Sequence, residues 1–413
     1  MKWAEGWYIS YALLGLSAAG LIPILLPLLV GRTGGAGRIG LVMAAFSLGG
    51  LTAPLWGWLA DRFRLHKWLL IGGLIGTAIG SVVLPLTLSF ALRSLLALIS
   101  GIGLAAAATI ANLFIVEAHP QEEWDTRIGW LQTYYGGGQV MGLLTAGIIG
   151  QSSPEKGLWL AGGIAIIAVI PAFLGTRRDT ALLMRHLPHL SRPAHHIEWP
   201  VGSPQHLYLH LSLQGLKRMF AAMESSFTLF LIAWFACFAG SAAFFSLYPV
   251  LMQRLYGVSP GPSSAGYAMA AALGLILYAP AGKWSARRGP LLLFQGALGL
   301  RCCAFLALAI LTLARFSGRG WLAMLFFLFN VLAWSVLSVS STELIASLAP
   351  QNEGEGMGVF NAVTALSGVI GAVMGGWAAS LWGYVAIPVM GMVGVGGALG
   401  TLAAAKFHDN RGP

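Results

Sequence analysis

Long uncharged apolar segments recur along the whole 413-residue chain, and they limit its possible folds more than any other feature. Each has about 20 residues or more, the length that an α-helix needs to cross a bilayer core of roughly 30 Å. Only 9% of the residues are charged and 57% are hydrophobic, which leaves too little charge to cover the surface of a water-soluble protein of this size. The sequence therefore predicts an all-α polytopic membrane protein.

Twelve apolar segments can be placed, six on each side of a polar stretch. The expected spans are 6–30, 37–60, 67–90, 92–116, 127–150, 157–174, 226–253, 263–284, 290–314, 320–347, 355–380 and 382–405. The polar stretch carries six Lys and Arg residues, so we expect it to link two bundles on the cytoplasmic side. The predicted domains are an N-terminal six-helix bundle at 1–174, the linker at 175–225 and a C-terminal six-helix bundle at 226–413.

The distribution of Lys and Arg predicts the orientation of the chain in the membrane. If both chain ends are cytoplasmic, 16 of the 24 Lys and Arg residues fall on that side and 7 on the other. Cytoplasmic loops carry such an excess of cations, so we expect both termini in the cytoplasm and a bacterial cytoplasmic (inner) membrane as the location. The apolar run near residue 1 is too long for the core of a signal peptide, and we expect it to be retained as the first span.

The two halves of the chain resemble each other in their loops. The stretch GWLADRFR at 57–64 matches GKWSARRG at 282–289, and each lies between the second and third spans of its half. Likewise HPQEEWDTRIG at 119–129 matches APQNEGEGMGV at 349–359, between the fourth and fifth spans. A duplicated six-span unit is an architecture of secondary transporters, whose substrate site lies near the bilayer midplane between the repeats.

The loop between spans 2 and 3 resembles that of the major facilitator superfamily of transporters. Gly57, Asp61, Arg62 and Lys67 match the signature of that family's loop. The family usually has Gly-Arg where this chain has RL at 64–65, and the second copy of the loop has Ala at 286 in the acidic position. The segment EGMGVFNAVTALSGVIGAVMGG at 355–376 also resembles the eleventh span of such permeases.

This resemblance implies two pseudo-symmetric bundles of six transmembrane helices that alternate between inward-open and outward-open states. It also implies a gating role for the loop residues Gly57, Asp61, Arg62 and Lys67, with Arg287 in the second copy. The alternative is that these cations only anchor the topology of the chain.

In that family spans 1, 4, 7 and 10 line the substrate path, and in this chain they carry polar and aromatic residues at helical spacing. Any one of these side chains could instead belong to ordinary core packing. Rings with a few hydrogen-bonding groups suit an amphipathic or aromatic organic solute better than a bare ion or a phosphate. The candidate substrate-binding residues, one of them from span 5, are Tyr8, Tyr11, Asn112, Gln139, Phe245, Tyr248, Asn330 and Trp334.

Few ionisable side chains lie within the spans, and such residues are candidates for function because their burial is costly. Arg301 is expected about 16 Å deep in span 9, and Glu343 lies near the cytoplasmic end of span 10. We expect these two to form a buried ion pair. The alternative is that Glu343 carries a proton for coupling, with Glu5 as the other candidate carboxylate.

Other functions have less support in the sequence. No basic cluster with interleaved aromatic residues indicates nucleic-acid binding. Six of the nine histidines fall in the linker and Cys302 adjoins Cys303, but the spacings match no metal site. We expect no metal and no cofactor. A membrane enzyme would need a cluster of His, Asp or Cys near the interface, and we expect no enzymatic activity.

The sequence favours a secondary active transporter that moves a small amphipathic organic solute by alternating access. We expect export by a monomer in contact with membrane lipid, with proton coupling left open. The alternatives are a metabolite or copper importer of the same fold and a non-transporting membrane assembly factor.

Overall fold

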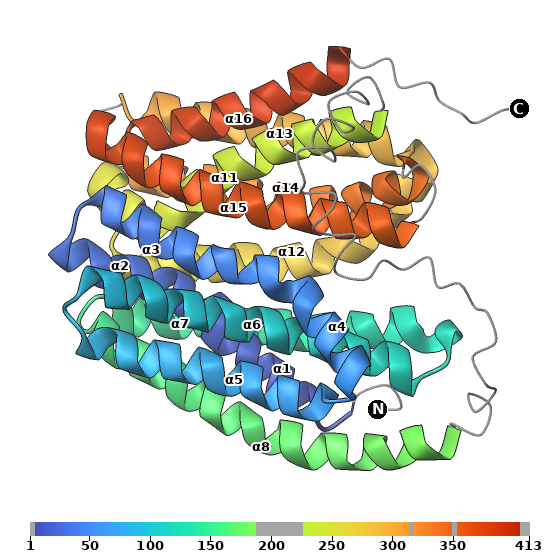
Figure 1. Ribbon diagram of the computed structural model, residues 1–413. Helices are drawn as coiled ribbons and strands as arrows, with labels where there is room; N and C mark the ends of the chain where they lie inside the picture. The colour runs from blue at the N-terminus through green and yellow to red at the C-terminus, as the bar shows by residue number, and fades with distance from the viewer. Residues whose placement is uncertain (1–4, 187–225, 314–317, 349–352, 405–413) are drawn as a thin grey trace, which may run out of the picture. The chain divides into compact units, whose positions relative to one another are not determined.

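A computed structural model of the chain describes residues 5–186, 226–313, 318–348 and 353–404 (Figure 1). Within these ranges the regular elements are helices, and eleven of the helical runs are long and apolar enough to cross a membrane. The all-α fold and its transmembrane character are thereby confirmed. Helix α7, over the expected span 127–150, falls outside these eleven, because residues such as Gln132 and Gln139 lower its hydropathy.

The first half of the chain contains six helical runs. The ends of the first five agree with the apolar segments within a few residues, and the sixth continues beyond the expected end at 174 to His186. The first run is divided by a short π-helix, η1, and the second by a short 3-10 helix, η2. The elements are α1 (Tyr8–Leu14), η1 (Gly15–Leu21), α2 (Ile22–Thr33), α3 (Ala36–Leu48), η2 (Gly49–Thr52), α4 (Ala53–Phe63), α5 (His66–Val83), η3 (Leu84–Leu86), α6 (Phe90–Ala118), η4 (Gln121–Glu123), α7 (Trp124–Gly150) and α8 (Pro154–His186).

The second half contains six further long helices. Proline stands at the start of two of them, where its missing N–H leaves no backbone hydrogen bond unmade. They are α11 (Ser226–Tyr256), α12 (Pro260–Arg288), α13 (Pro290–Leu311), α14 (Arg319–Leu348), α15 (Glu353–Trp382) and α16 (Ala386–Ala404).

The chain divides into two compact units, which are described separately here. The first contains Met1–Glu198 and Tyr248–Ala272, and the second contains Trp199–Leu247 and Leu273–Pro413. Residues 187–225, most of the expected linker, lie outside the described part of the chain, while α8 continues through the first part of that linker to His186. The domain boundaries at 174 and 226 therefore remain a prediction.

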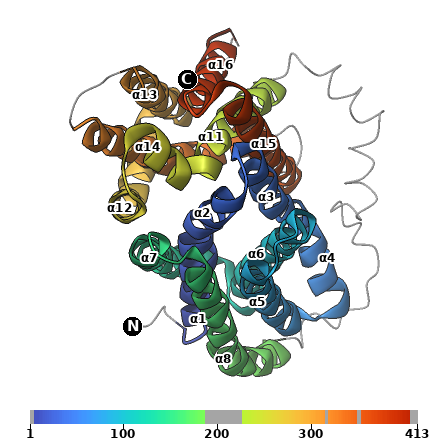
Figure 2. The ribbon, with the colours of Figure 1, turned by 90° about the vertical axis from the view of Figure 1, so that its left-hand side faces the viewer.

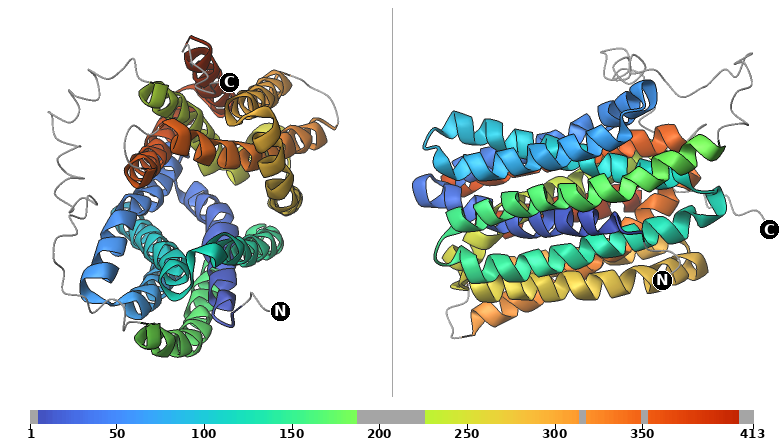
Figure 3. Two further views of the ribbon diagram at one scale, coloured as in Figure 1. Left: turned by 90° about the vertical axis from the view of Figure 1, so that its right-hand side faces the viewer. Right: turned by 90° about the horizontal axis from the view of Figure 1, so that it is seen from below.

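Corresponding helices in the two halves have the same neighbours. In the first unit the third helical run, α5, packs against α6 and α8, and Figure 2 shows these helices end-on. In the second unit the equivalent helix, α13, packs against α14 and α16. Figure 3 shows α8, in green, running alongside both α5 and α1. The shared pattern of neighbours supports the internal repeat seen in the loop sequences.

Glycines bring the first and fifth helical runs of each half into backbone contact. A Cβ added at Gly138 on α7 would lie 1.8 Å from the carbonyl oxygen of Ala12 on α1. A Cβ added at Gly371 on α15 would lie 2.2 Å from the carbonyl oxygen of Ala239 on α11. Small residues allow such close approach of helices in a membrane, where van der Waals packing holds helices together. The repeat thus extends to individual backbone contacts.

We predict that Gly138→Ala destabilises the protein, because the new methyl group would overlap the backbone of α1. The neighbouring Gly137 has no atom within 4 Å of an added Cβ, so Gly137→Ala is the matched control on the same turn of α7. Overpacking of this kind costs about 1–3 kcal/mol. Thermal unfolding in nanodiscs should show a lower Tm for Gly138→Ala than for Gly137→Ala. Equal Tm values would contradict the close approach.

The loop between the second and third runs ends α4 in a left-handed conformation. Arg64 has φ 52° and ψ 40°, and it is the one non-glycine residue with positive φ in the described ranges. The matching position of the second half is Gly289, with φ 87°. The two copies of the loop therefore make the same backbone turn, and only the second uses the residue that adopts it without strain.

We predict that Arg64→Gly stabilises the protein by about 0.5–1 kcal/mol, because glycine adopts positive φ without the Cβ clash that arginine meets. Arg64→Ala removes the same charge but keeps the Cβ, and it serves as the control. A higher Tm for Arg64→Gly than for Arg64→Ala is the expected result. The reverse order would mean that the turn is not left-handed.

Candidate functional site

One end of the first unit holds an ion-pair network centred on the Glu5 carboxylate. Its Oε1 accepts from Arg127 Nη1 at 2.6 Å and lies 2.8 Å from His119 Nε2, while its Oε2 accepts from Trp7 Nε1 at 2.7 Å. Arg127 Nε also donates to Glu123 Oε2 at 2.7 Å. We call these five residues the Glu5 cluster. It ties the segment before α1 to the loop after α6 and to the first turn of α7.

The imidazole of His119 in this cluster is partly buried and lies among charged side chains. Burial lowers the pKa of His119 below its ordinary value of 6.5, and the nearby Glu5 carboxylate opposes that shift. The charged groups facing the imidazole are Glu5, Arg127 and Glu123. Because the folded state holds the neutral imidazole, the unfolded chain binds more protons below pH 6.5, and stability falls as the pH falls through that range.

We predict that the Tm of the wild-type protein falls between pH 7.5 and 5.5 by roughly 1–3 °C more than that of His119→Gln. Glutamine keeps a donor for Glu5 but cannot take up a proton. Thermal unfolding in nanodiscs at both pH values measures the difference. A variant whose Tm changes with pH as much as that of the wild type would refute a contribution from His119.

Three of the predicted substrate-binding residues come together beside this cluster. Tyr8 is fully buried, and its ring lies 5.8 Å from that of Tyr134. The Tyr11 ring lies 4.8 Å from that of Tyr135, and the side chains of Gln132 and Asn112 lie near the Tyr11 hydroxyl. Tyrosines on α1 and α7 therefore contact each other in edge-to-face and tilted pairs, with a few amide groups beside them.

The remaining amide contacts show how this group is held. Asn112 Nδ2 donates to the carbonyl oxygen of Ala108 at 2.8 Å, and its Oδ1 accepts from Gln132 Nε2 at 3.4 Å. Gln132 is exposed, whereas Gln139 is half-buried two turns further along α7. The tyrosines and amides of the first unit thus form a surface that combines rings with hydrogen-bonding groups.

The second unit has an aromatic cluster that the sequence analysis did not identify. The Trp234 ring lies within 4.7–6.5 Å of five other rings, and its Nε1 donates to Thr364 Oγ1 at 2.8 Å. Those rings belong to Phe230, Phe238, Phe294, Trp334 and Phe360. Trp234 and Phe238 stand four residues apart on α11, so they lie on the same face of that helix.

Arg301 lies next to this cluster, at 2% exposure. Its Nε donates to Asn330 Oδ1 at 2.9 Å, and its guanidinium carbon is 5.8 Å from the ring centres of both Phe245 and Trp334. Three of the predicted substrate-binding residues, from two helices, therefore surround one buried cation from a third helix.

The expected ion pair between Arg301 and Glu343 does not form. Arg301 donates to Asn330, whereas the Glu343 carboxylate accepts a hydrogen bond from the Ser285 hydroxyl on α12. Asn330 and Glu343 stand thirteen residues apart on α14, which is about 20 Å along the helix axis. An arginine that reaches Asn330 is therefore too far from Glu343, and that prediction is wrong.

Tyr248, a further candidate on α11, packs against α12. Its hydroxyl donates to the carbonyl oxygen of Ser263 on α12 at 2.8 Å, and its ring lies 5.4 Å from that of Tyr267. With an exposed fraction of 1%, it packs as a core side chain in this structure.

Among the described side chains of the proposed gating loop, Lys67 makes a specific contact with α8. Lys67 Nζ donates to the carbonyl oxygen of Phe173 on α8 at 3.0 Å and lies 3.8 Å from the centre of that residue's ring. Arg62 and Arg287 are exposed, and a Cβ added at Gly57 would meet no atom within 4 Å. The side chain of Asp61 lies outside the described part of the chain. Gating by this loop remains a prediction.

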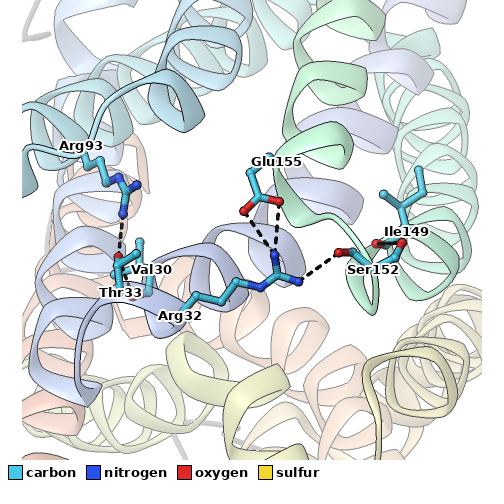
Figure 4. A network of polar contacts seen from close by, with 7 residues as sticks. All are labelled: Val30, Arg32, Thr33, Arg93, Ile149, Ser152 and Glu155. Atoms are coloured by element: carbon cyan, nitrogen blue, oxygen red, sulfur yellow. Dashed lines mark hydrogen bonds and ion pairs between the residues drawn. The ribbon is translucent and has the colours of Figure 1, made fainter.

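A second polar network closes the opposite end of the first unit (Figure 4). Arg32 Nη1 lies 3.2 Å from Glu155 Oε1, and Arg32 Nη2 donates to the carbonyl oxygen of Ser152 at 3.2 Å. Arg93 Nη1 donates to Thr33 Oγ1 at 2.8 Å. The network ties the last turn of α2 to α6 and to the connection between α7 and α8, and the sequence patterns did not indicate it.

A family model of the Major Facilitator Superfamily matches residues 7–372. The chain belongs to this superfamily. Its helices are those of an integral membrane protein, and the family moves small molecules across membranes. No curated protein sequence matches the chain.

Solved structures show how widely this fold is shared at low sequence identity. The nucleoside transporter NupG is 14% identical with a TM-score of 0.75, covering 97% of this chain and 98% of that one. A D-xylose-proton symporter is 18% identical with a TM-score of 0.66, covering 96% and 95%. A bacterial homologue of the human lysosomal transporter Spinster is 15% identical with a TM-score of 0.65, covering 96% and 92%. At these identities the similarity establishes the fold.

Proposed function

We propose that this member of the Major Facilitator Superfamily exports a small amphipathic organic solute by alternating access. The proposal is supported by one observation: in each unit, aromatic rings lie beside a small number of hydrogen-bonding side chains. In the first unit Tyr11 and Tyr135 accompany Gln132, and in the second unit Trp334 and Phe245 accompany Asn330. Such surfaces suit a solute that is largely apolar and has one or two polar groups.

The direction and the substrate class are tested by flux in proteoliposomes. Purified protein is reconstituted, and a panel of radiolabelled aromatic acids, amines, nucleosides and sugars is presented with and without an imposed pH gradient. Protein-free liposomes are the control. Saturable flux of an amphipathic organic solute supports the proposal, and flux of sugars alone would favour a metabolite importer. Absence of flux for every solute would favour a non-transporting role.

Coupling to protons is part of the proposal, with Glu343 as the carrier. Its carboxylate accepts from a hydroxyl, and no ion pair of Glu343 is found among the residues that the structure describes. Glu5 is held by Arg127 and lies against His119. Protonation of Glu343 would break none of the ion pairs of the described residues, whereas protonation of Glu5 would break its contact with Arg127.

We predict that Glu343→Gln abolishes gradient-driven flux and leaves solute counterflow intact, whereas Glu5→Gln leaves the coupling in place. Glutamine keeps the oxygen that accepts the Ser285 hydroxyl but cannot carry a proton. Flux and counterflow in the same proteoliposomes separate coupling from folding. Unchanged coupling in Glu343→Gln would remove this residue as the carrier.

The orientation of the protein is proposed from the cation distribution. With both termini in the cytoplasm, the Glu5 cluster and the loop between α4 and α5 face the cytoplasm, and the Arg32 network faces the opposite side. A bacterial inner membrane fits this arrangement, with a monomer as the transporting unit.

A further inference from the structure

The orientation of the Asn330 amide is fixed by Arg301. A guanidinium nitrogen can only donate, so the amide oxygen of Asn330 must be the atom that faces Arg301 Nε, at 2.9 Å. The amide nitrogen is therefore directed away from the guanidinium. Because both side chains are 2% exposed or less, neither can turn freely into solvent.

The amide nitrogen of Asn330 has no hydrogen-bond acceptor among the residues that the structure describes. It is fully buried, and the residue as a whole is 0% exposed. Buried polar groups are nearly always hydrogen-bonded, and a buried donor left without an acceptor costs about 1–3 kcal/mol. The site therefore calls for an oxygen atom that the described side chains and backbone do not supply.

The surroundings of this donor define the chemistry of what it would bind. Trp334 stands one helical turn after Asn330 on α14, and the Phe238 ring on α11 lies 5.6 Å from that of Trp334. The Phe245 ring, also on α11, lies beside the Arg301 guanidinium. These three rings are half-buried, whereas Asn330 is fully buried. The Asn330 amide is therefore more deeply buried than the three aromatic rings near it, which are partly exposed.

The charge of Arg301 favours a negatively charged partner at this position. In surroundings of low dielectric constant the field of a buried cation is weakly screened, so an anion is attracted and an amine is repelled. A carboxylate also supplies the oxygen acceptor that the Asn330 amide lacks. The rings would then contact the apolar part of the same molecule.

We propose that the second unit recognises an aromatic or amphipathic carboxylate, with the Asn330 amide nitrogen as donor to the carboxylate and Arg301 as the residue that positions this amide. The inference rests on the proposed transport function and names its substrate class. Trp334 and Phe245 hold the apolar body of the solute. Asn330 is thus the residue that contacts the carboxylate, while Arg301 positions its amide and supplies the positive charge that favours an anion.

Binding to the full-length protein in nanodiscs tests this assignment with three probes that share one ring. The probes are 3-phenylpropanoate, 3-phenylpropanamide and 3-phenylpropylamine, and isothermal titration calorimetry measures their affinities. The carboxylate should bind about tenfold more tightly than the amine, with the amide between them. Equal affinities, tighter binding of the amine or no binding of any probe would overturn the proposal.

Two variants test the roles of the residues. Asn330→Leu keeps the volume and removes the donor, so it should lower the affinity for the carboxylate about tenfold. It also removes the oxygen that accepts from Arg301 Nε, so the Tm should fall as well, and the affinity is measured on the folded protein. Arg301→Lys keeps the charge but not the fixed Nε contact, and it should weaken carboxylate binding while sparing the amine. The control is Asn361→Leu, the same change at an exposed position of α15. Unchanged carboxylate affinity in Asn330→Leu would mean that the amide is satisfied by water alone.

The outcome is separable from that of the proposed function. If the flux panel shows transport and Asn330→Leu transports carboxylates as well as the wild type does, the substrate assignment falls and the transport function stands. If no solute in the panel crosses the membrane, the transport function falls regardless of what the probes bind.

Discussion

Backbone contact between the first and fifth helical runs of each half is the constraint on which the rest of the structure depends. In a bilayer there is no water to drive apolar surfaces together, so close packing has to hold the helices. Gly138 and Gly142 provide it against α1 and η1, and Gly371 and Gly375 provide it against α11. In the first unit the backbone contact also brings the tyrosines of the two helices together, Tyr8 with Tyr134 and Tyr11 with Tyr135.

Charged side chains of the first unit lie mainly at the ends of its helices, because burying a charge within the lipid core is costly. The Glu5 cluster and the Arg32 network lie at the two ends of the first unit, where their carboxylates and cations pair with each other. Arg301 is different, because it lies within the span α13 and meets an amide and two rings. The cost of burying a charge is high, and cations placed so deeply usually serve a substrate or ion pathway. This contrast sets Arg301 apart from the arginines at the ends.

The sequence predicted the helical runs well because hydropathy over about 20 residues is a strong signal, whereas the boundaries of the two halves, inferred from the loop repeat, remain a prediction. It proposed Asn330, Trp334 and Phe245 as site residues from helical spacing on single helices, and the structure places all three around Arg301. It paired Arg301 with Glu343 wrongly, because spacing along one helix fixes the face but not which residue of another helix lies at the same depth. The Glu5 cluster was missed for a similar reason. Glu5 and Arg127 are 122 positions apart, and no local pattern connects them.

The π-helix in the first span has a consequence for how that span tolerates changes in length. A π-helix holds one residue more than an α-helix over the same rise, and such stretches are rare outside functional sites. A deletion of one residue within Gly15–Leu21 can therefore be absorbed by conversion to an α-helix, with the faces of α1 and α2 kept in the same rotational relation. Helix α5 contains no π-helical stretch. A deletion of one residue there would rotate the part of the helix after the deletion by about 100° relative to the part before it. Single-residue length variants among homologous chains should accordingly gather in this short stretch.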